Sequence, residues 1–522
     1  MLKNGVESDF TIKKSIIGLS IIVIIALAVR LFYYNPEIPP TSDALAYFYY
    51  AIDTSISGHL PTDYSPANNG WPAFLGMVFS TIHFSSITSY MQLQFVSTIV
   101  ISTLTIIPTF VLCNKLVGRR IALVGASIIA FEPRLIQNSL LGISDTLYIF
   151  LVASIFALFL NNDKRIIFIS FGIAALASIV RAEGIFVFFA ISVMFLIRFR
   201  NEGKIIVPKF LIALSIFSLV ILPMAAYKID IHGDDRIFGR AAESISASYY
   251  VEEKSPILTG LENFPKFLIW DMIPVFIFLM PIGVYYLFKK VEYKKLTIIF
   301  GVIFCSIPAF YVYTIPIPET RYFFFLYPLF SVVSVLFVEN IVGKVKQKDL
   351  ITWMIIAGVL TGSILFNFWN MIDYEYESES LLVANTIVSI AGGINQYEPE
   401  HKYVTVVDVI NRWNEMESII IDQDRIEGET LRKSFPYSVK MISTDGYNSL
   451  NNFILENQDK GLTHLIIDEN PNRPDFLKDV FYNETKYSYL EKVYDSNDEL
   501  LRYKAKIFKI NYELIDKSFQ QN

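Results

Sequence analysis

The ionisable residues that could take part in chemistry begin in a polar segment, residues 35–71, which lies between two strongly apolar stretches. This segment lacks lysine and arginine and contains five other ionisable side chains: Glu37, Asp43, Asp53, His59 and Asp63. The prolines and the Thr41–Ser42 pair that precede Asp43 place it in the first turn of a predicted helix. An acid at this position is a functional candidate, although the helix dipole alone would also account for it.

The same predicted helix has an aromatic face that includes Tyr47 and Tyr50. We expect this face to lie on the surface of a bilayer, because aromatic side chains favour that interface. Asp53 and Asp63 come later in the polar segment. We expect both to be ordinary solvated loop acids.

Further charged residues stand at or just inside the ends of later apolar stretches, where ionisable groups are costly and are functional candidates by default. Glu132 and Arg134 flank a proline, and they could also form a simple interfacial salt bridge. Asp145 lies about two turns, or roughly 9 Å, into an apolar run, so its carboxylate needs a partner or a water-filled cavity. Arg181 and Glu183 lie in a short connection, and they could equally be stop charges.

Two later segments also carry charged side chains that could bind ligands. The long connection at residues 228–267 contains His232, Asp234, Asp235, Arg236 and Arg240. Such side chains can bind metal ions, but this group lacks a fixed ligand geometry, so we favour a polar loop. Glu319 and Arg321 stand where another apolar segment begins. The fork of a guanidinium suits phosphate, so Arg321 is predicted to be a phosphate ligand.

The composition indicates that membrane helices position these residues. Of the 522 residues, 53% are hydrophobic and only 18% are charged, which is more apolar surface than a soluble core could hide. The first helix is expected to be retained and not cleaved as a signal peptide. We predict about eleven membrane-spanning helices, at residues 16–34, 89–113, 121–131, 139–160, 166–180, 184–197, 205–227, 268–288, 296–315, 322–342 and 350–372.

The basic residues predict the orientation of these helices. With eleven helices, every basic cluster falls on one side of the membrane, which the positive-inside rule identifies as cytoplasmic. The clusters are at residues 13–14, 115–120, 164–165, 198–204, 289–295 and 344–348. The N-terminus is therefore predicted to be cytoplasmic, and the candidate acids and arginines are predicted to lie on the opposite side.

The chain is predicted to consist of a membrane domain, residues 1–372, and a water-soluble domain, residues 373–522. The first part has 28 Lys and Arg against 23 Asp and Glu, whereas the second has 16 against 27. Strands are predicted at residues 403–409 and 464–468, an edge-like strand at 500–510 and a polar helix at 475–485. This pattern predicts a small extracytoplasmic α/β domain. It has no disulfides, because Cys113 and Cys305 both lie in apolar segments.

Several segments, taken in order, resemble one family. They are TSDALAYFYYA followed by GWPAF, then EPRLIQNSLLGISDTLYIF, ASIVRAEGIFVF and PETRYFFFLYPLF. In this order and on these sides of the membrane, they resemble the polyprenyl-phosphate-sugar-dependent glycosyltransferases of the GT-C superfamily. The nearest resemblance is to the dolichyl-phosphate-mannose protein mannosyltransferases and the lipid A aminoarabinose transferases, and the end of the chain is similar to tails on archaeal members.

This resemblance implies an activity. A sugar, expected to be a hexose such as mannose, would pass from a polyprenyl or dolichyl phosphate to an extracytoplasmic hydroxyl group, with inversion at the anomeric carbon. The acceptor would be a glycan, a protein or a lipid; membrane lipid is the other partner, nucleic acid is not, and no cofactor is expected. The resemblance also implies site residues: Asp43 as catalytic base; Arg321, Arg181 and Arg236 at the donor phosphate; and Glu132, Arg134, Asp145, Glu183, His232 and Glu319 in support.

Two other functions remain open. An oligosaccharyltransferase of the same superfamily would use a divalent metal held by several acids. However, this chain has no WWDYG-like motif, and Ala44 stands where many relatives carry a second acid beside the one that Asp43 matches. A transporter or non-catalytic scaffold would be expected to show internal repeats, and the two halves of the sequence show none.

The orientation can be tested with reporters that are active on only one side of a membrane. A reporter fused after Lys348 is expected to report the cytoplasm, because a basic cluster surrounds it. A reporter fused after Asn522 is expected to report the opposite side. If both report the same side, or if the two sides are reversed, the assignment of every loop is wrong.

Overall fold

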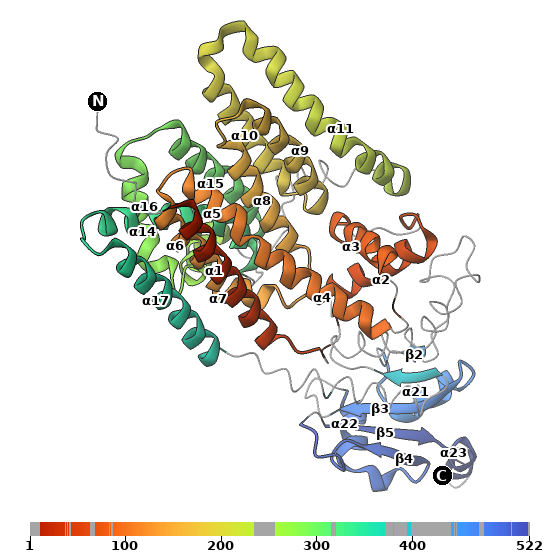
Figure 1. Ribbon diagram of the computed structural model, residues 1–522. Helices are drawn as coiled ribbons and strands as arrows, with labels where there is room; N and C mark the ends of the chain where they lie inside the picture. Colours follow the sequence, from red (N-terminus) through yellow and green to blue (C-terminus); the bar gives the residue numbers. More distant parts are fainter. Residues whose placement is uncertain are drawn as a thin grey trace. The chain divides into compact units, whose positions relative to one another are not determined.

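The computed structural model divides into two compact units (Figure 1). The first comprises Met1–Tyr34, Thr62–Leu75 and Leu93–Met371, and the second comprises Asn35–Pro61, Gly76–Gln92 and Ile372–Asn522. The structure describes residues 11–36, 38, 40, 43–62, 68–82, 84, 87–233, 256–314, 320–370, 379, 394–397, 440–442, 444, 446–468, 474–502 and 504–519. The polar segment at residues 35–71, predicted as one loop, is therefore shared between the units.

The first unit is built from helices (Figure 1). In chain order they are α1 (Ile12–Tyr33), α4 (Ile87–Leu104), α5 (Ile106–Asn114), α6 (Arg119–Phe131), α7 (Pro133–Asn138), α8 (Asp145–Phe159), α9 (Lys164–Val180), α10 (Gly184–Phe199), η1 (Arg200–Ile205), α11 (Ile206–His232), α13 (Pro256–Asp271), α14 (Phe276–Lys289), α15 (Tyr293–Val312), η2 (Arg321–Leu326), α16 (Tyr327–Gly343) and α17 (Lys348–Trp369). Helix α3 (Gly70–Thr81) and helix α4 are each divided between the two units, because Gly76–Gln92 belongs to the second.

The length and composition of these helices support the prediction that this is a membrane protein. Six described helical segments are long and apolar enough to cross a membrane, and the pair α13 and α14 would add a seventh if it were one span. All eleven predicted ranges contain helix, but α6, α8, α9 and α10 have only 13 to 17 residues each. The number eleven therefore remains a prediction.

The predicted span at residues 268–288 is wrong at its beginning. Helix α13 ends at Asp271, α14 begins at Phe276, and the two helices meet at 108°. Pro274 lies in the break between them. Because proline has no N–H to donate and its ring clashes with the preceding turn, a straight helix cannot easily continue through it.

Small residues bring helices α14 and α16 into close contact. A Cβ atom on Gly283 of α14 would lie only 2.2 Å from the carbonyl oxygen of Val333 in α16. Close backbone approach of this kind is a common way for membrane helices to associate. Cys113 and Cys305 are both buried and free in this unit.

The helical part of the second unit contains α2 (Asp43–Ser57), the second half of α3 and the first turn and a half of α4. Two expectations for α2 are wrong. Tyr47 and Tyr50 are buried and do not form an exposed aromatic face. Asp53 is not solvated either: it is 2% exposed, because it follows Tyr50 by one turn and shares its buried face. Asp63 lies outside the described residues.

The second unit also contains a five-stranded sheet with the strand order β2-β1-β3-β5-β4 (Figure 1). The strands are β1 (Ile394–Tyr397), β2 (Lys440–Ile442), β3 (Leu462–Asp468), β4 (Leu490–Asp495) and β5 (Ala505–Ile510). Strands β1, β2 and β3 are parallel, whereas β5 runs antiparallel to both β3 and β4. Among the described residues of this part, the helices α21 (Leu450–Gln458), α22 (Asp475–Tyr482) and α23 (Tyr512–Phe519) accompany them.

The sheet confirms part of the predicted pattern. The strand predicted at residues 464–468 is β3, and the polar helix predicted at 475–485 contains α22 and the short η4 (Glu484–Lys486). The edge-like strand at 500–510 is wrong in its position. Strand β5 pairs on both sides, and β4, which was not predicted, lies at the edge instead. The strand predicted at 403–409 lies outside the described residues.

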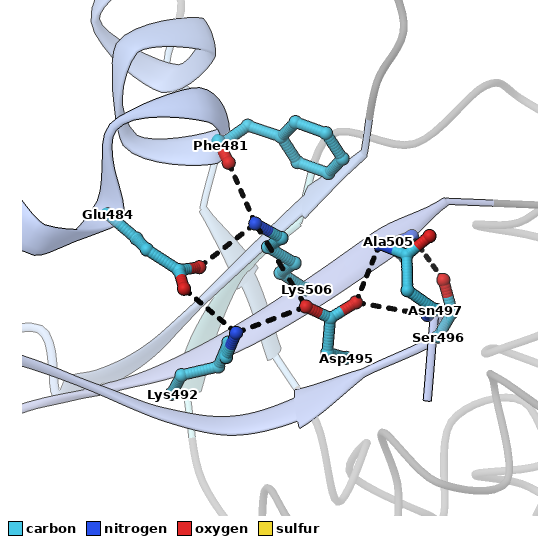
Figure 2. Close-up of polar contacts among 8 residues, drawn as sticks. All are labelled: Phe481, Glu484, Lys492, Asp495, Ser496, Asn497, Ala505 and Lys506. Carbon is cyan, nitrogen blue, oxygen red and sulfur yellow. Dashed lines mark hydrogen bonds and ion pairs between the residues drawn. The ribbon is translucent and has the colours of Figure 1, made fainter. Parts of the chain in front are cut away.

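A ladder of four charges connects β4 and β5 to η4 (Figure 2). Glu484 accepts from Lys492 at 2.8 Å and from Lys506 at 2.9 Å. Lys492 also donates to Asp495 at 3.1 Å. The two lysines lower the pKa of the Glu484 carboxyl below its ordinary value. Burial acts to raise the pKa of Asp495, but hydrogen bonds from Asn497 and Lys492 outweigh burial and lower it.

This ladder makes the local stability of the sheet dependent on pH. Because both folded carboxyl pKa values lie below the ordinary values near 4, their contribution is present at neutral pH and is lost as the pH falls through about 4 toward 3. Hydrogen exchange of β4 and β5 in the full chain, corrected for intrinsic rates, should accelerate by roughly five-fold at pH 3, equivalent to about 1 kcal/mol.

The Glu484→Gln variant should already exchange faster at neutral pH and should respond less to acid. Asp475→Asn is the matched control, because the Asp475 side chain is 99% exposed in its pair with Lys478. Equal acid responses in wild type and in Glu484→Gln would show that the ladder does not stabilise the sheet.

Candidate functional site

Arg181 is the centre of a buried group of polar side chains, which we call the Arg181 cluster: Asn138, Asp145, Arg181 and Glu183. Arg181 caps the end of α9, and Glu183 directly precedes α10. The guanidinium donates through Nη1 to Oδ1 of Asp145 and through Nη2 to Oε1 of Glu183, the latter at 2.8 Å. Asn138 donates to the second oxygen of Asp145 at 3.2 Å. The prediction that Asp145 requires a partner is confirmed.

The segment before Asp145 is held by the GWPAF stretch. Helix α8 begins at Asp145, and residues 139–144 are not helical, so the predicted position two turns inside a helix is wrong. Gly142 interrupts the helix with a φ of 69°, a conformation that residues with a Cβ rarely adopt. Its carbonyl oxygen accepts from Nε1 of Trp71 at 3.1 Å and from Nε2 of Gln94 at 2.8 Å. These contacts fix the start of α8.

Two tyrosine rings lie beside the Arg181 guanidinium. Its central carbon is 5.9 Å from the centroid of the Tyr148 ring and 6.0 Å from that of Tyr322. The guanidinium is thus shared by two carboxylates and two rings, and the cluster has a formal charge of −1 when its acids are ionised. Such a cluster orients its members well. It does not offer an uncompensated positive charge to an anion.

Arg134 is the centre of a second buried group, the Arg134 cluster, which consists of Glu132, Arg134 and Asp271. The Arg134 guanidinium lies 3.4 Å from Oδ1 of Asp271 and 3.8 Å from Oε1 of Glu132. It also donates to the carbonyl oxygens of Trp270, at 2.7 Å, and Ile273. These carbonyls lie at the bend between α13 and α14, so Arg134 supplies hydrogen bonds that the interrupted helix lacks.

Arg321 begins η2 and is followed by Tyr322, one of the two rings beside Arg181. Its side chain is half-buried, and its guanidinium carbon lies 5.7 Å from the Tyr322 ring. Tyr322 therefore links the first turn of η2 to the Arg181 cluster. The structure brings Tyr322 to Arg181, although the two are far apart in the chain.

Other predicted site residues are placed separately or not described. Asp43 is the first residue of α2, is exposed, and belongs to the second unit. Arg236 and Glu319 lie outside the described residues, as do Asp234 and Asp235 in the same predicted loop. His232 is the last residue of α11, and its side chain is not described.

Sequence reasoning missed several buried charged residues, among them Arg30, Asp271 and Lys228, the last of which is 1% exposed. Arg30 lies in α1 and is fully buried, with hydrogen bonds to the Ser102 hydroxyl at 3.1 Å and the Ala130 carbonyl at 2.8 Å. Asp271 is fully buried at the end of α13. The sequence feature that could have identified them is a single charged residue inside an otherwise apolar run, because such a charge is costly in a membrane helix.

No group of three or more His, Cys, Asp or Glu residues that could hold a metal ion occurs within the described part of the chain. The Arg134 cluster contains two carboxylates, but the guanidinium between them occupies the position that a cation would need.

The chain was compared with known proteins. No family model and no curated protein sequence matches it. Among solved structures, ArnT from Cupriavidus metallidurans bound to undecaprenyl phosphate is similar, with a TM-score of 0.57, 10% identity and coverage of 94% of this chain and 97% of ArnT. The Archaeoglobus fulgidus oligosaccharyltransferase in complex with Zn and sulfate has a TM-score of 0.52 and 13% identity, over 86% of this chain and 68% of that one.

These similarities identify the fold. The chain shares its fold with ArnT and with the Archaeoglobus oligosaccharyltransferase; in this chain the fold consists of a set of apolar helices followed by a small sheet-containing part. At 10% to 13% identity the similarity establishes the fold and not the reaction.

Proposed function

We propose that this protein is a membrane glycosyltransferase that moves a sugar from a polyprenyl or dolichyl phosphate to a hydroxyl group outside the cytoplasm. The observation that carries the proposal is the shared fold over 94% of the chain with a protein that was solved with undecaprenyl phosphate bound. The second neighbour is an oligosaccharyltransferase, which was also solved with an acceptor peptide tethered to it. The sugar is proposed to be a hexose such as mannose.

The reaction needs a base more than it needs an acid. A phosphate monoester is a weakly basic leaving group, so it departs without being protonated, whereas the acceptor hydroxyl must lose its proton as the new bond forms. Asp43 is proposed as this base. Its side chain is exposed in the first turn of α2, where an acceptor hydroxyl can reach it. Attack on the face opposite the leaving phosphate would invert the anomeric carbon.

The donor phosphate is proposed to bind Arg321. Both Arg321 and Arg181 were predicted as phosphate ligands, and the contacts of Arg181 distinguish their roles. Arg181 already donates to Asp145 and Glu183, so a phosphate would have to compete with two carboxylates for it. Arg181 is better suited to position Tyr322, the neighbour of Arg321 in η2. Arg236 remains a further proposed ligand.

A metal-dependent transfer, as in an oligosaccharyltransferase, is the second candidate, because one neighbour was solved with zinc. One assay separates the two candidates. Purified protein is incubated with a radiolabelled polyprenyl-phosphate sugar and with an extract that contains acceptors, in the presence and absence of a chelator. Transfer that survives chelation supports the metal-free reaction, and activity that is lost and then restored by manganese supports the metal-dependent one. Absence of transfer under both conditions would contradict the proposed function.

Substitution of Arg321 tests the phosphate ligand. Arg321→Lys keeps the positive charge but loses the bidentate fork, so it should raise the KM for the donor, and Arg321→Ala should raise it further, by roughly ten-fold or more. Arg119→Lys is the control, since Arg119 begins α6 next to the basic cluster on the predicted cytoplasmic side. Unchanged donor KM in both Arg321 variants would show that this arginine does not bind the phosphate.

Substitution of Asp43 tests the base. Asp43→Asn removes the proton acceptor with little change in shape, so kcat should fall by about 10²- to 10⁴-fold while donor binding is retained. Asp459→Asn is the control, because Asp459 is an exposed acid of the same unit. Asp53→Asn is unsuitable for this purpose because Asp53 is buried. Near-normal turnover by a correctly folded Asp43→Asn enzyme would exclude Asp43 as the base.

A further inference from the structure

A small polar cavity lies inside the first unit beside the Arg181 cluster. The centre of a water molecule can occupy a volume of about 10 Å³ in this cavity, and this is about the volume needed to hold one water molecule. Its lining comes from α4, α7, α8 and the residue that precedes α5: Ser102, Thr105, Leu135, Asn138, Thr146 and Ile149. Four of these six side chains are polar, so the cavity suits water better than an apolar group.

On one side of this cavity, Ser102 connects it to a buried positive charge. Arg30 donates from Nε to the Ser102 hydroxyl oxygen at 3.1 Å and from Nη1 to the carbonyls of Ala26 and Ala130. Among the residues that the structure describes, its Nη2 has no hydrogen-bond partner and no carboxylate pairs with it. The Ser102 hydroxyl accepts from this cation, so its own hydrogen is free to point elsewhere.

On the other side, Asn138 presents an acceptor that lacks a donor. Its Nδ2 faces a carboxylate oxygen of Asp145, and because an ionised carboxylate only accepts, this contact fixes which end of the amide is the nitrogen. Its Oδ1 is buried and has no partner among the described residues. A buried acceptor without a donor is costly, so the missing donor should be a water molecule.

The two threonines in the lining do not supply this donor. The Thr105 hydroxyl donates to the carbonyl of Ile101 at 2.9 Å, and the Thr146 hydroxyl points to the carbonyl of Ile143 at 3.4 Å. Their hydrogens are directed to the backbone, which leaves only lone pairs for the cavity. An occupant must therefore donate to Asn138 and accept from Ser102, and a water molecule does both.

We propose that a water molecule in this cavity completes a hydrogen-bonded chain from Arg30 through Ser102 and Asn138 to Asp145, and that Asn138 and Ser102 are positioning residues for Arg181. Every bond in the chain runs in one direction, from the guanidinium of Arg30 toward the Asp145 carboxylate. Bonds aligned in this way polarise one another and strengthen the last of them. The chain holds one oxygen of Asp145 in place while the other accepts from Arg181. This inference rests on the proposed function of the site.

The first test is kinetic and uses the full-length protein in lipid nanodiscs. Ser102→Ala removes the hydroxyl that links Arg30 to the water, with a minimal change in side-chain volume. It should lower kcat/KM for a polyprenyl-phosphate sugar by roughly three- to ten-fold. Ser102→Thr keeps the hydroxyl and should retain activity. Thr105→Val is the matched control, because it removes a hydroxyl from the same cavity whose hydrogen is already used. Equal losses in Ser102→Ala and Thr105→Val would overturn the proposal.

A double-mutant cycle tests whether Ser102 acts through Asp145. In an Asp145→Asn background the hydrogen-bonded chain no longer ends on a carboxylate. Adding Ser102→Ala should then change kcat/KM by less than about two-fold. Fully additive losses would show that Ser102 acts independently of Asp145 and would contradict the inference. Both single variants are first checked for correct folding by thermal unfolding in the same nanodiscs.

The second test does not depend on activity. A cryo-electron microscopy map that resolves ordered water should show density between the Ser102 hydroxyl and Oδ1 of Asn138 in wild type and not in Ser102→Ala. A cavity without density in wild type overturns the inference even if transfer is observed. Density with no measurable transfer supports the water chain and contradicts the proposed function instead.

Discussion

The first unit depends on the cost of placing a guanidinium among apolar helices. An unpaired charge in such surroundings costs several kcal/mol, so each buried arginine must find hydrogen-bond acceptors before the helices can pack. Arg30, Arg134 and Arg181 all find theirs at the ends of other helices, on backbone carbonyls or carboxylates. These contacts determine which ends meet: α1 with α6, α7 with the bend after α13, and α9 with the start of α8.

The same requirement gives the arginines different roles. Arg134 and Arg181 are each shared between two carboxylates, so neither offers an uncompensated positive charge, and both clusters are suited to orienting groups. Arg321 follows a different pattern, because it is half-buried at the first turn of η2 and next to a tyrosine that contacts the Arg181 cluster.

In the sheet of the second unit, ion pairs between basic and acidic side chains contribute less to stability. The Glu484 ladder is partly exposed to solvent, where an ion pair contributes about 1 kcal/mol or less because water screens it. Its charges can be gained or lost without a change of fold. A charge in the helical unit cannot be changed so easily, because its desolvation has to be compensated by specific partners. A charged residue among the apolar helices therefore depends more strongly on its partners than a charged residue in this sheet does.

The sequence by itself determined the apolar helices, the strand β3 and the helix α22, because hydropathy and periodicity are local properties. It also placed Arg134, Arg181 and Arg321 at or near the ends of apolar segments, where charge is costly. Only the tertiary structure decided which of them pair. Asp145 meets Arg181 from 36 residues away, and Arg134 meets Asp271 from 137 residues away. It also buried Asp53 and Arg30 and placed β5 inside the sheet. These outcomes depend on contacts between distant segments, and a local pattern of residues contains no information about which distant segment will cover it.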